Sequence, residues 1–412
     1  MWDINSGYAV GFNGTIIKLI SSGGFTVTTS SNPISGGTTS GGGAYSSGST
    51  VTISSTAGIS YQFHNWVEGN NIVSTNSAYT FVISSNRNFT ANFKPTAPTA
   101  TDASSISQTY FNANWNAVAS ATGYSLDVAI DNSFTNFVAG YNDLDVGNIL
   151  TFSVNTNLIA NTTYYYRVRA YNSVSSSNNS NTKSITTLPN PPPSPLANSA
   201  TQITQTSFYA NWNNSNSATG YKIDVAVDDQ FTNILSTYNN KDVGNVTTLN
   251  ITGLTTNVTC FYRVRAYNPG GNSANSNIIT LTTLRNPPAT PVSSPANAIT
   301  QTSFNANWNI SNDATSYILD VSNDANFNNF VINNLTVGNV TSYQVTVLNP
   351  GTQYWYRIKA NNNGGNSSYS NVINTITLHD ATGATAATVI TTSGFNANWN
   401  ASPGATGYRL DV

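Results

Sequence analysis

The chain has 412 residues, only 7% of them charged, and a formal net charge of -2 at pH 7. So small a charge creates no field that would attract nucleic acid or an anionic membrane surface, which excludes these partners. No apolar run reaches the roughly 20 residues that cross a bilayer. A surface rich in Ser, Thr and Asn, with a single cysteine, favours an extracellular or cell-surface location without disulfides. No signal-peptide pattern opens the chain and its end falls inside a repeat, so we expect a fragment.

Residues 1–24 predict two short strands around the turn Asn13-Gly14, the first with Tyr8 and Val10 and the second with Ile16 and Ile17. The pattern GYAVGFNGTIIK resembles the closing piece of a blade in propeller repeats like those of photosystem II assembly factors. This resemblance implies a propeller-blade-like stub.

Residues 25–94 alternate polar and apolar residues in five strand-like segments separated by Gly-rich turns such as Gly41-Gly42-Gly43. The segments are FTVTTS, STVTIS, YQFHNW, YTFVIS and FTANF. Their order and spacing resemble the divergent internalin B-repeat family, whose members are small β modules of bacterial surface proteins.

Three linkers, 94–100, 188–197 and 284–296, hold eleven of the fifteen prolines and open three similar segments. Because proline fixes φ and favours extended geometry, we expect these linkers to be semi-rigid and the array to be a rod. Each segment contains a Trp in an N-W-N setting, and Trp115, Trp212, Trp308 and Trp399 are spaced by 97, 96 and 91 residues. The chain is therefore a tandem repeat.

Each repeat continues with A-T-G/S-Y-x-x-D-V, a variable middle with V-G-N, and Y-x-Y-R-V-x-A, as in YYYRVRAYN at Tyr164 to Asn172. These features resemble the fibronectin type III domain, and the variable middle resembles modules of secreted Bacteroidota proteins. The resemblance implies an all-β fold, a linear array of Ig-like sandwiches after a small β module. The copies span residues 95–188, 189–284 and 285–378, with an incomplete fourth at 379–412.

Alternation in the YYYRVRAYN strand directs Tyr164, Tyr166, Val168 and Ala170 toward the core and the intervening residues outward. Aromatic and basic residues therefore share one face in each copy, where they could stack on a surface glycan or dock a protein. This predicted partner-binding face comprises Tyr165, Arg167, Arg169, Tyr171, Phe261, Arg263, Arg265, Tyr267, Trp355, Arg357 and Lys359.

A structural interpretation competes with this site. The strand that carries Asp127 is expected to lie beside the basic strand, with Asp127, Asp224 and Asp320 turned outward toward the arginines. Cross-strand ion pairs contribute roughly 0.2 to 1 kcal/mol, which would explain why both sets recur. We favour this interpretation over a ligand site.

Catalysis is not expected, because the sequence contains neither the paired carboxylates of glycosidases nor a Ser/His/Asp grouping, and no cofactor or metal motif. Cys260 replaces the tyrosine found at Tyr164 and Tyr354, so the second copy should lack the hydrogen bond of the tyrosine corner. The cysteine itself is expected to be a small buried hydrophobe.

Three functions remain open. The first, which we favour, is a non-catalytic extracellular stalk or spacer that presents or adheres to something. The second is the subunit of a self-assembling filament, and the third is an accessory region of a secreted carbohydrate-active or proteolytic enzyme.

Overall fold

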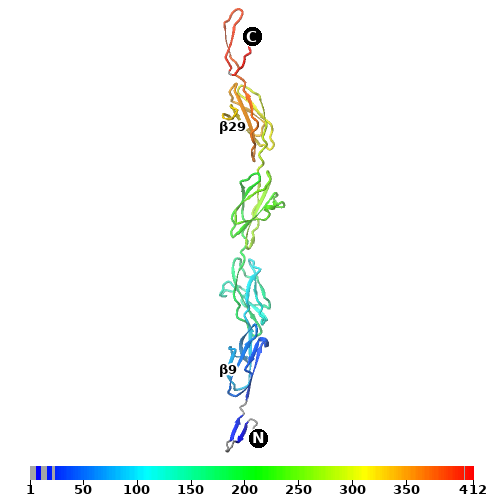
Figure 1. The fold of residues 1–412 in the computed structure, drawn as a ribbon, viewed down its shortest axis with the longest axis vertical. Helices are drawn as coiled ribbons and strands as arrows, with labels where there is room; N and C mark the ends of the chain where they lie inside the picture. The colour runs from blue at the N-terminus through cyan, green and yellow to red at the C-terminus, as the bar shows by residue number, and fades with distance from the viewer. Residues whose placement is uncertain (1–5, 11–15, 21–23, 403) are drawn as a thin grey trace. The chain divides into compact units, whose positions relative to one another are not determined.

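The computed structural model describes residues 6–10, 16–20, 24–402 and 404–412, which form β-strands with two short 3-10 helices. Figure 1 shows the modules in chain order by colour. The first two strands, β1 (Ser6–Val10) and β2 (Ile16–Ile20), pair antiparallel as predicted. The turn Asn13-Gly14 lies outside the described residues, and the propeller resemblance stays a prediction.

The small β module consists of two sheets with strand orders β5-β3-β10-β7-β8 and β4-β6-β9. All five predicted segments are strands, namely β3 (Gly24–Asn32), β6 (Thr50–Ala57), β7 (Tyr61–Glu68), β9 (Ala78–Val82, labelled in Figure 1) and β10 (Arg87–Pro95). Three more strands, β4 (Gly37–Ser40), β5 (Gly43–Ser46) and β8 (Asn71–Ser74), complete the sheets. The core between the sheets is built around Trp66, Phe89 and Phe93.

Each of the three repeats folds into a sandwich of a three-stranded sheet and a larger sheet. The first contains β11 (Ala100–Ser104), β12 (Phe111–Trp115) and β15 (Thr151–Val154), opposite β14 (Leu144–Gly147), β13 (Gly123–Ala129), β16 (Thr163–Tyr171) and β17 (Lys183–Thr186). All these neighbouring strands pair antiparallel. The predicted all-β fold is therefore confirmed.

The second and third sandwiches repeat this topology. The second contains β18 (Ala197–Thr201), β19 (Phe208–Trp212) and β22 (Thr248–Ile251), opposite β21 (Lys241–Gly244), β20 (Gly220–Ala226), β23 (Thr259–Asn268), β24 (Gly271–Asn272) and β25 (Ile279–Thr282). The third contains β26 (Ser293–Asn297), β27 (Phe304–Trp308) and β30 (Ser342–Val345), opposite β29 (Phe330–Thr336), β28 (Ser316–Ser322), β31 (Gln353–Asn362), β32 (Gly365–Asn366) and β33 (Ile373–Ile376). In the fourth, incomplete repeat, β34 (Ala384–Thr388) pairs with β35 (Asn396–Trp399).

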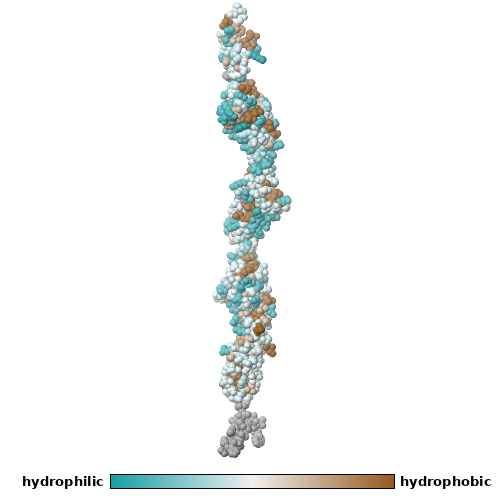
Figure 2. All heavy atoms as spheres, viewed as in Figure 1, coloured by the Kyte–Doolittle hydropathy of each residue, from teal (hydrophilic) through white to brown (hydrophobic). Residues whose placement is uncertain are grey.

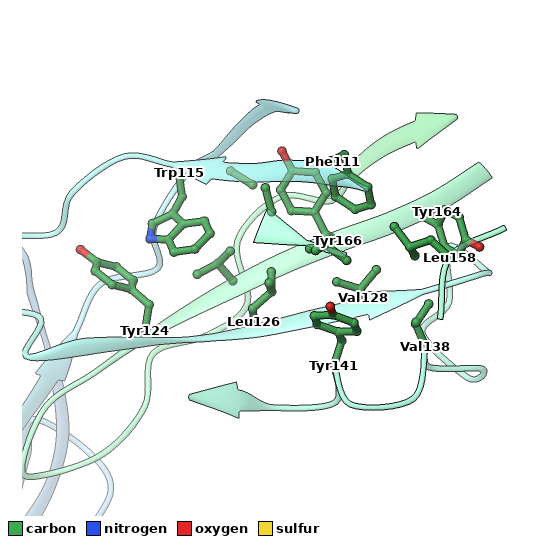
Figure 3. Packing of buried hydrophobic residues seen from close by; sticks show 14 of the residues in the cluster. Phe111, Trp115, Tyr124, Leu126, Val128, Val138, Tyr141, Leu158, Tyr164 and Tyr166 are labelled. Atoms are coloured by element: carbon green, nitrogen blue, oxygen red, sulfur yellow. The ribbon is translucent and has the colours of Figure 1, made fainter. Parts of the chain in front are cut away.

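Aromatic residues fill the core of each sandwich, and Figure 3 shows the first of these cores. The indole of Trp115 packs against the ring of Tyr124, with centroids 5.8 Å apart, and Phe111 packs against Tyr166 at 5.9 Å. Residues 164, 166, 168 and 170 are all buried, which confirms the predicted alternation. The same pairs recur in the second and third cores.

The first Asn of the N-W-N motif holds together the outer face of the smaller sheet. The register of β11 against β12 shifts between Thr101 and Ser104, so the backbone there leaves the regular ladder. The amide nitrogen of Asn114 donates to the carbonyl of Asp102 at 2.9 Å, and its oxygen accepts the hydroxyl of Thr151 at 2.7 Å. Asn211 makes the equivalent bonds in the second sandwich, so this asparagine has a structural role.

The tyrosine corner is present in two of the three sandwiches. The hydroxyl of Tyr164 accepts the backbone N–H of Ile159 at 2.8 Å, and that of Tyr354 accepts the N–H of Asn349 at 2.9 Å. Cys260 occupies this position in the second sandwich and is fully buried, and burial raises the pKa of its thiol. The predicted burial of this cysteine is confirmed.

The tyrosine corner yields a stability prediction. Replacing Tyr354 by Phe should lower the free energy of unfolding of the third sandwich by about 1 kcal/mol, because the N–H of Asn349 loses its acceptor. Amide hydrogen exchange measured on peptides from β31 of the intact chain reports this change. Tyr165→Phe, followed in the same way on peptides from β16, is the matched control, because that hydroxyl has no hydrogen-bond partner among the described residues. Equal effects of the two substitutions would contradict the corner's role.

Candidate interaction face

The candidate face is the outer side of the larger sheet in each sandwich. Its residues come from the central strands β16, β23 and β31, where partly exposed side chains alternate with buried ones. In the first sandwich, β13 and β17 lie on either side of β16. The predicted face residues are therefore brought together within each sandwich, and their neighbours determine which remain available to a ligand.

A buried carboxylate lies at the centre of this face. Asp127 stands directly opposite Arg167, and its Oδ2 accepts the guanidinium Nε at 2.9 Å. The predicted opposition of acidic and basic residues is thus confirmed, and it recurs as Asp224–Arg263 at 3.0 Å and Asp320–Arg357 at 3.1 Å. Asp127 points to the outer side as predicted, but only 2% of its side chain is exposed.

The loop after β13 buries this carboxylate. The carboxylate of Asp131 accepts backbone N–H groups of Ser133, Thr135 and Asn136, forming an Asx-type turn. Within the turn Phe134 adopts φ 55°, and its ring centroid lies 4.0 Å from the guanidinium carbon of Arg167. The loop therefore covers the ion pair with an aromatic ring.

Sequence reasoning missed this loop, although the sequence carries a signal for it. The pattern D-x-x-F-T/N-N occurs at residues 131–136, 228–233 and 324–329. Phe231 and Phe327 likewise lie over Arg263 and Arg357, at 4.0 and 4.1 Å. A recurring aspartate three residues before a phenylalanine indicates a capped turn that presents an aromatic ring.

The second basic residue of each face is also engaged within its own sandwich. Arg169 donates to the carboxylate of Asp143 at 2.6 Å, and the backbone N–H of Asp143 donates to Asp127 at 2.7 Å. The corresponding side chains bond in the same way, Arg265 to Asn240 at 2.8 Å and Lys359 to Asn334 at 3.1 Å. The basic residues thus hold the neighbouring strand in place.

Tyr171 is fixed by an acidic side chain and a glycine. Its hydroxyl donates to Asp145 at 2.8 Å, which raises the pKa of this tyrosine, and its ring covers Gly123, where a Cβ would overlap the ring. The same arrangement recurs with Tyr267, Asp242 and Gly220. In the third sandwich Ser316 and Asn361 replace the glycine and the tyrosine together.

One aromatic residue of each face remains without such polar ties, namely Tyr165, Phe261 and Trp355. Tyr165 lies between Ala129 and Ser184 in the register of the sheet. Phe261 lies between Ala226 and Thr280, and Trp355 between Ser322 and Asn374. Because these neighbours are small or uncharged, the aromatic side chains are the groups that the faces offer to a partner.

Family comparisons agree with this architecture. Residues 27–97 match the family model of the divergent InlB B-repeat domain, and residues 191–282 and 289–376 match that of the fibronectin type III domain. The chain thus contains a divergent InlB B-repeat domain and, further along, two fibronectin type III domains, in agreement with the two resemblances read from the sequence.

Proteins similar to the chain include two curated proteins and a solved structure. Contactin-6 of Mus musculus is 32% identical over 139 residues, covering 31% of this chain and 13% of its own length. Exoglucanase B of Cellulomonas fimi is 28% identical over 330 residues, covering 75% of this chain and 28% of its own length. The crystal structure of chicken CNTN1 FN1-FN3 domains is 17% identical, covers 69% of this chain and 99% of that one, and has a TM-score of 0.34. The chain thus spans less than a third of either curated relative.

In the part of the chain that the structure describes, no three His, Cys, Asp or Glu side chains gather in a way that could hold a metal ion. Over the same residues, no helix is long and apolar enough to cross a membrane.

The buried ion pair yields a prediction with an internal control. Asp127→Ala should lower the free energy of unfolding of the first sandwich by about 3 to 5 kcal/mol, because Arg167 is left unpaired beneath Phe134. Asp102→Ala should cost less than about 1 kcal/mol, since the carboxylate that pairs with Lys183 is 91% exposed. Denaturant unfolding, monitored by hydrogen exchange of the β16 amides, measures the loss of unfolding free energy in each variant. Equal losses of unfolding free energy in the two variants would contradict the prediction that the buried ion pair stabilises the sandwich more than the exposed one.

A second prediction concerns acid. Backbone N–H bonds, chiefly from Thr135, hold the pKa of Asp131 below its ordinary value of 3.8. Because the folded-state pKa is the lower one, the loop's stabilisation is present above pH 3.8 and is lost as the pH falls through the lowered value. NMR titration of the Thr135 amide should give a midpoint below 3.8, absent in Asp131→Asn. A midpoint above that value would refute the capped turn.

Proposed function

We propose that the chain is a non-catalytic extracellular array that acts as a stiff stalk or spacer of a secreted or surface protein of bacteria and contributes to adhesion. The observation that carries this proposal is the repeated use of Asp, Arg and Tyr to hold each sandwich together, which leaves these groups engaged inside the fold. The proposed modules are 1–24, 25–94, 95–188, 189–284, 285–378 and 379–412.

Hydrogen bonds that tie the linkers 188–197 and 284–296 to the sandwich after each of them support the stiffness of the array. Asn268 donates to the carbonyl of Asn190 at 2.8 Å. Asn362 donates to the carbonyl of Asn286 at 2.9 Å in the third repeat. Together with prolines that restrict φ, these bonds limit the freedom of the chain as it enters a sandwich.

The same tie is made by a serine at a second point of each linker. Ser215 donates to the carbonyl of Pro193 at 2.6 Å, and Ser311 to that of Ala289 at 2.5 Å. Two anchors on a proline-rich segment favour a spacer over a freely jointed tether. An extracellular location is supported by the composition and by the divergent InlB B-repeat domain.

The accessory region of an enzyme is a second candidate, because a relative that covers 75% of the chain is named Exoglucanase B. The chain covers only 28% of that protein, and the repeated structural use of the carboxylates favours the stalk. The filament remains a third candidate, which rests on uncharged edge strands such as β15.

Solution scattering tests the proposed stalk. We expect an extended profile whose maximum dimension exceeds that of one sandwich several-fold, because the linkers are restricted at both anchors. Replacing Pro191, Pro192 and Pro193 by glycine should broaden the distance distribution without unfolding the sandwiches. A compact profile for the unaltered chain would refute the stalk. Ordered filaments in negative-stain electron microscopy across a concentration series would favour self-assembly instead.

A further inference from the structure

At three positions on its outer face, the third sandwich has one more aromatic side chain than the first sandwich and two more than the second. These positions hold Phe330, Trp355 and Tyr369. The first sandwich has Phe137, Tyr165 and Asn179 at these positions, and the second has Ile234, Phe261 and Asn275. The framework is shared by all three copies, so this difference is confined to the surface of one copy.

These aromatic side chains surround one short row of the sheet. Ser322 pairs with Phe330 on one side and with Trp355 on the other, so the three residues share one face. The ring centroids of Phe327 and Phe330 are 6.0 Å apart, and 37% of Phe330 is exposed. Figure 2 shows hydrophobic residues gathered on the visible side of this sandwich.

Tyr369 extends the aromatic surface past the arginine. The guanidinium of Arg357 lies between two rings, 4.1 Å from the centroid of Phe327 and 3.9 Å from that of Tyr369. Its charge is neutralised by Asp320, and Lys359 is held by Asn334 and by the hydroxyl of Tyr369. The hydroxyl of Ser322 is buried and donates to the carbonyl of Asn329 at 2.7 Å, so the exposed, uncharged hydrogen-bonding side chain beside Trp355 is that of Asn374.

A shorter connection explains why this surface is open. Between the capping phenylalanine and the V-G-N element the third repeat is two residues shorter than its siblings, and it lacks the buried Tyr141 and Tyr238. The chain therefore runs as one seven-residue strand, β29 (labelled in Figure 1), where the others have a loop and a four-residue strand. Phe330 and Val331 are exposed on this strand.

We propose that the outer face of the third sandwich binds an uncharged polysaccharide chain, and that the first two sandwiches serve as spacers. The face of an aromatic ring is electron-rich and attracts the C–H groups of a pyranose, while the exposed side chain of Asn374 supplies an uncharged partner for its hydroxyls. An open sheet face suits an extended chain better than a small ligand. This inference rests on the proposed function, for which it supplies the adhesive partner.

Affinity electrophoresis of the full chain tests the inference, with soluble xylan, glucomannan or hydroxyethyl cellulose in the gel. We expect at least one of these polymers to retard the chain at low and at raised salt alike. Trp355→Ala and Tyr369→Ala should each weaken the interaction by about tenfold or more. Tyr110→Ala, which removes an exposed aromatic ring from the first sandwich, is the control and should leave retardation unchanged.

Three results would overturn the inference. One is a lack of retardation by all three polymers. Another is retardation that is lost at raised salt, because screening would then identify a charge-based site. The last is that Tyr165→Ala or Phe261→Ala reduces retardation as much as Trp355→Ala does, which would show that all the sandwiches bind the polymer. An extended scattering profile together with absent retardation would leave the stalk intact, so the two proposals fail separately.

Discussion

The fold of each sandwich outside its main core depends on one buried carboxylate. Asp127 and its counterparts lie on the outer side of a sheet, where an unpaired charge shielded from water would cost several kcal/mol. The carboxylate is therefore surrounded by an arginine from the next strand, a backbone N–H from the edge strand and a phenylalanine from the loop. One side chain thus fixes the position of three elements, and each sandwich carries a second small packed layer on that side.

This layer decides which residues of the candidate face are free. An arginine that pairs with a buried carboxylate and stacks on an aromatic ring would have to break both contacts to bind a ligand, and would lose much of their stabilising energy. The face is therefore less cationic than its composition indicates, and its aromatic members are what a partner would meet. The simultaneous replacement of Gly123 and Tyr171 by Ser316 and Asn361 in the third repeat shows the same coupling, because the ring and the glycine fit only each other.

Local alternation was sufficient to predict the core strands and the pairing of Asp127 with Arg167, because both follow from the period of two in adjacent strands. Alternation could not predict that Asp127 is buried, since its cover comes from a loop held by bonds from Asp131 to backbone amides. The strands β4, β5 and β8 were missed for another reason. They are only four residues long and, apart from β8, begin with glycine, so pairing with longer neighbours determines their conformation.

Repetition within one chain separates structural from functional residues. A residue that recurs in every copy meets a demand that every copy shares, and the contacts of Asn114, Arg167 and Asp131 show that this demand is folding. A departure inside the core, such as Cys260 in place of the corner tyrosine, shows only that the fold accepts the substitution, because no partner can reach a buried position. A departure on an exposed face that adds a large aromatic side chain, such as Tyr369, enlarges the apolar surface that the face offers to a partner. The third sandwich is where the chain shows such a departure.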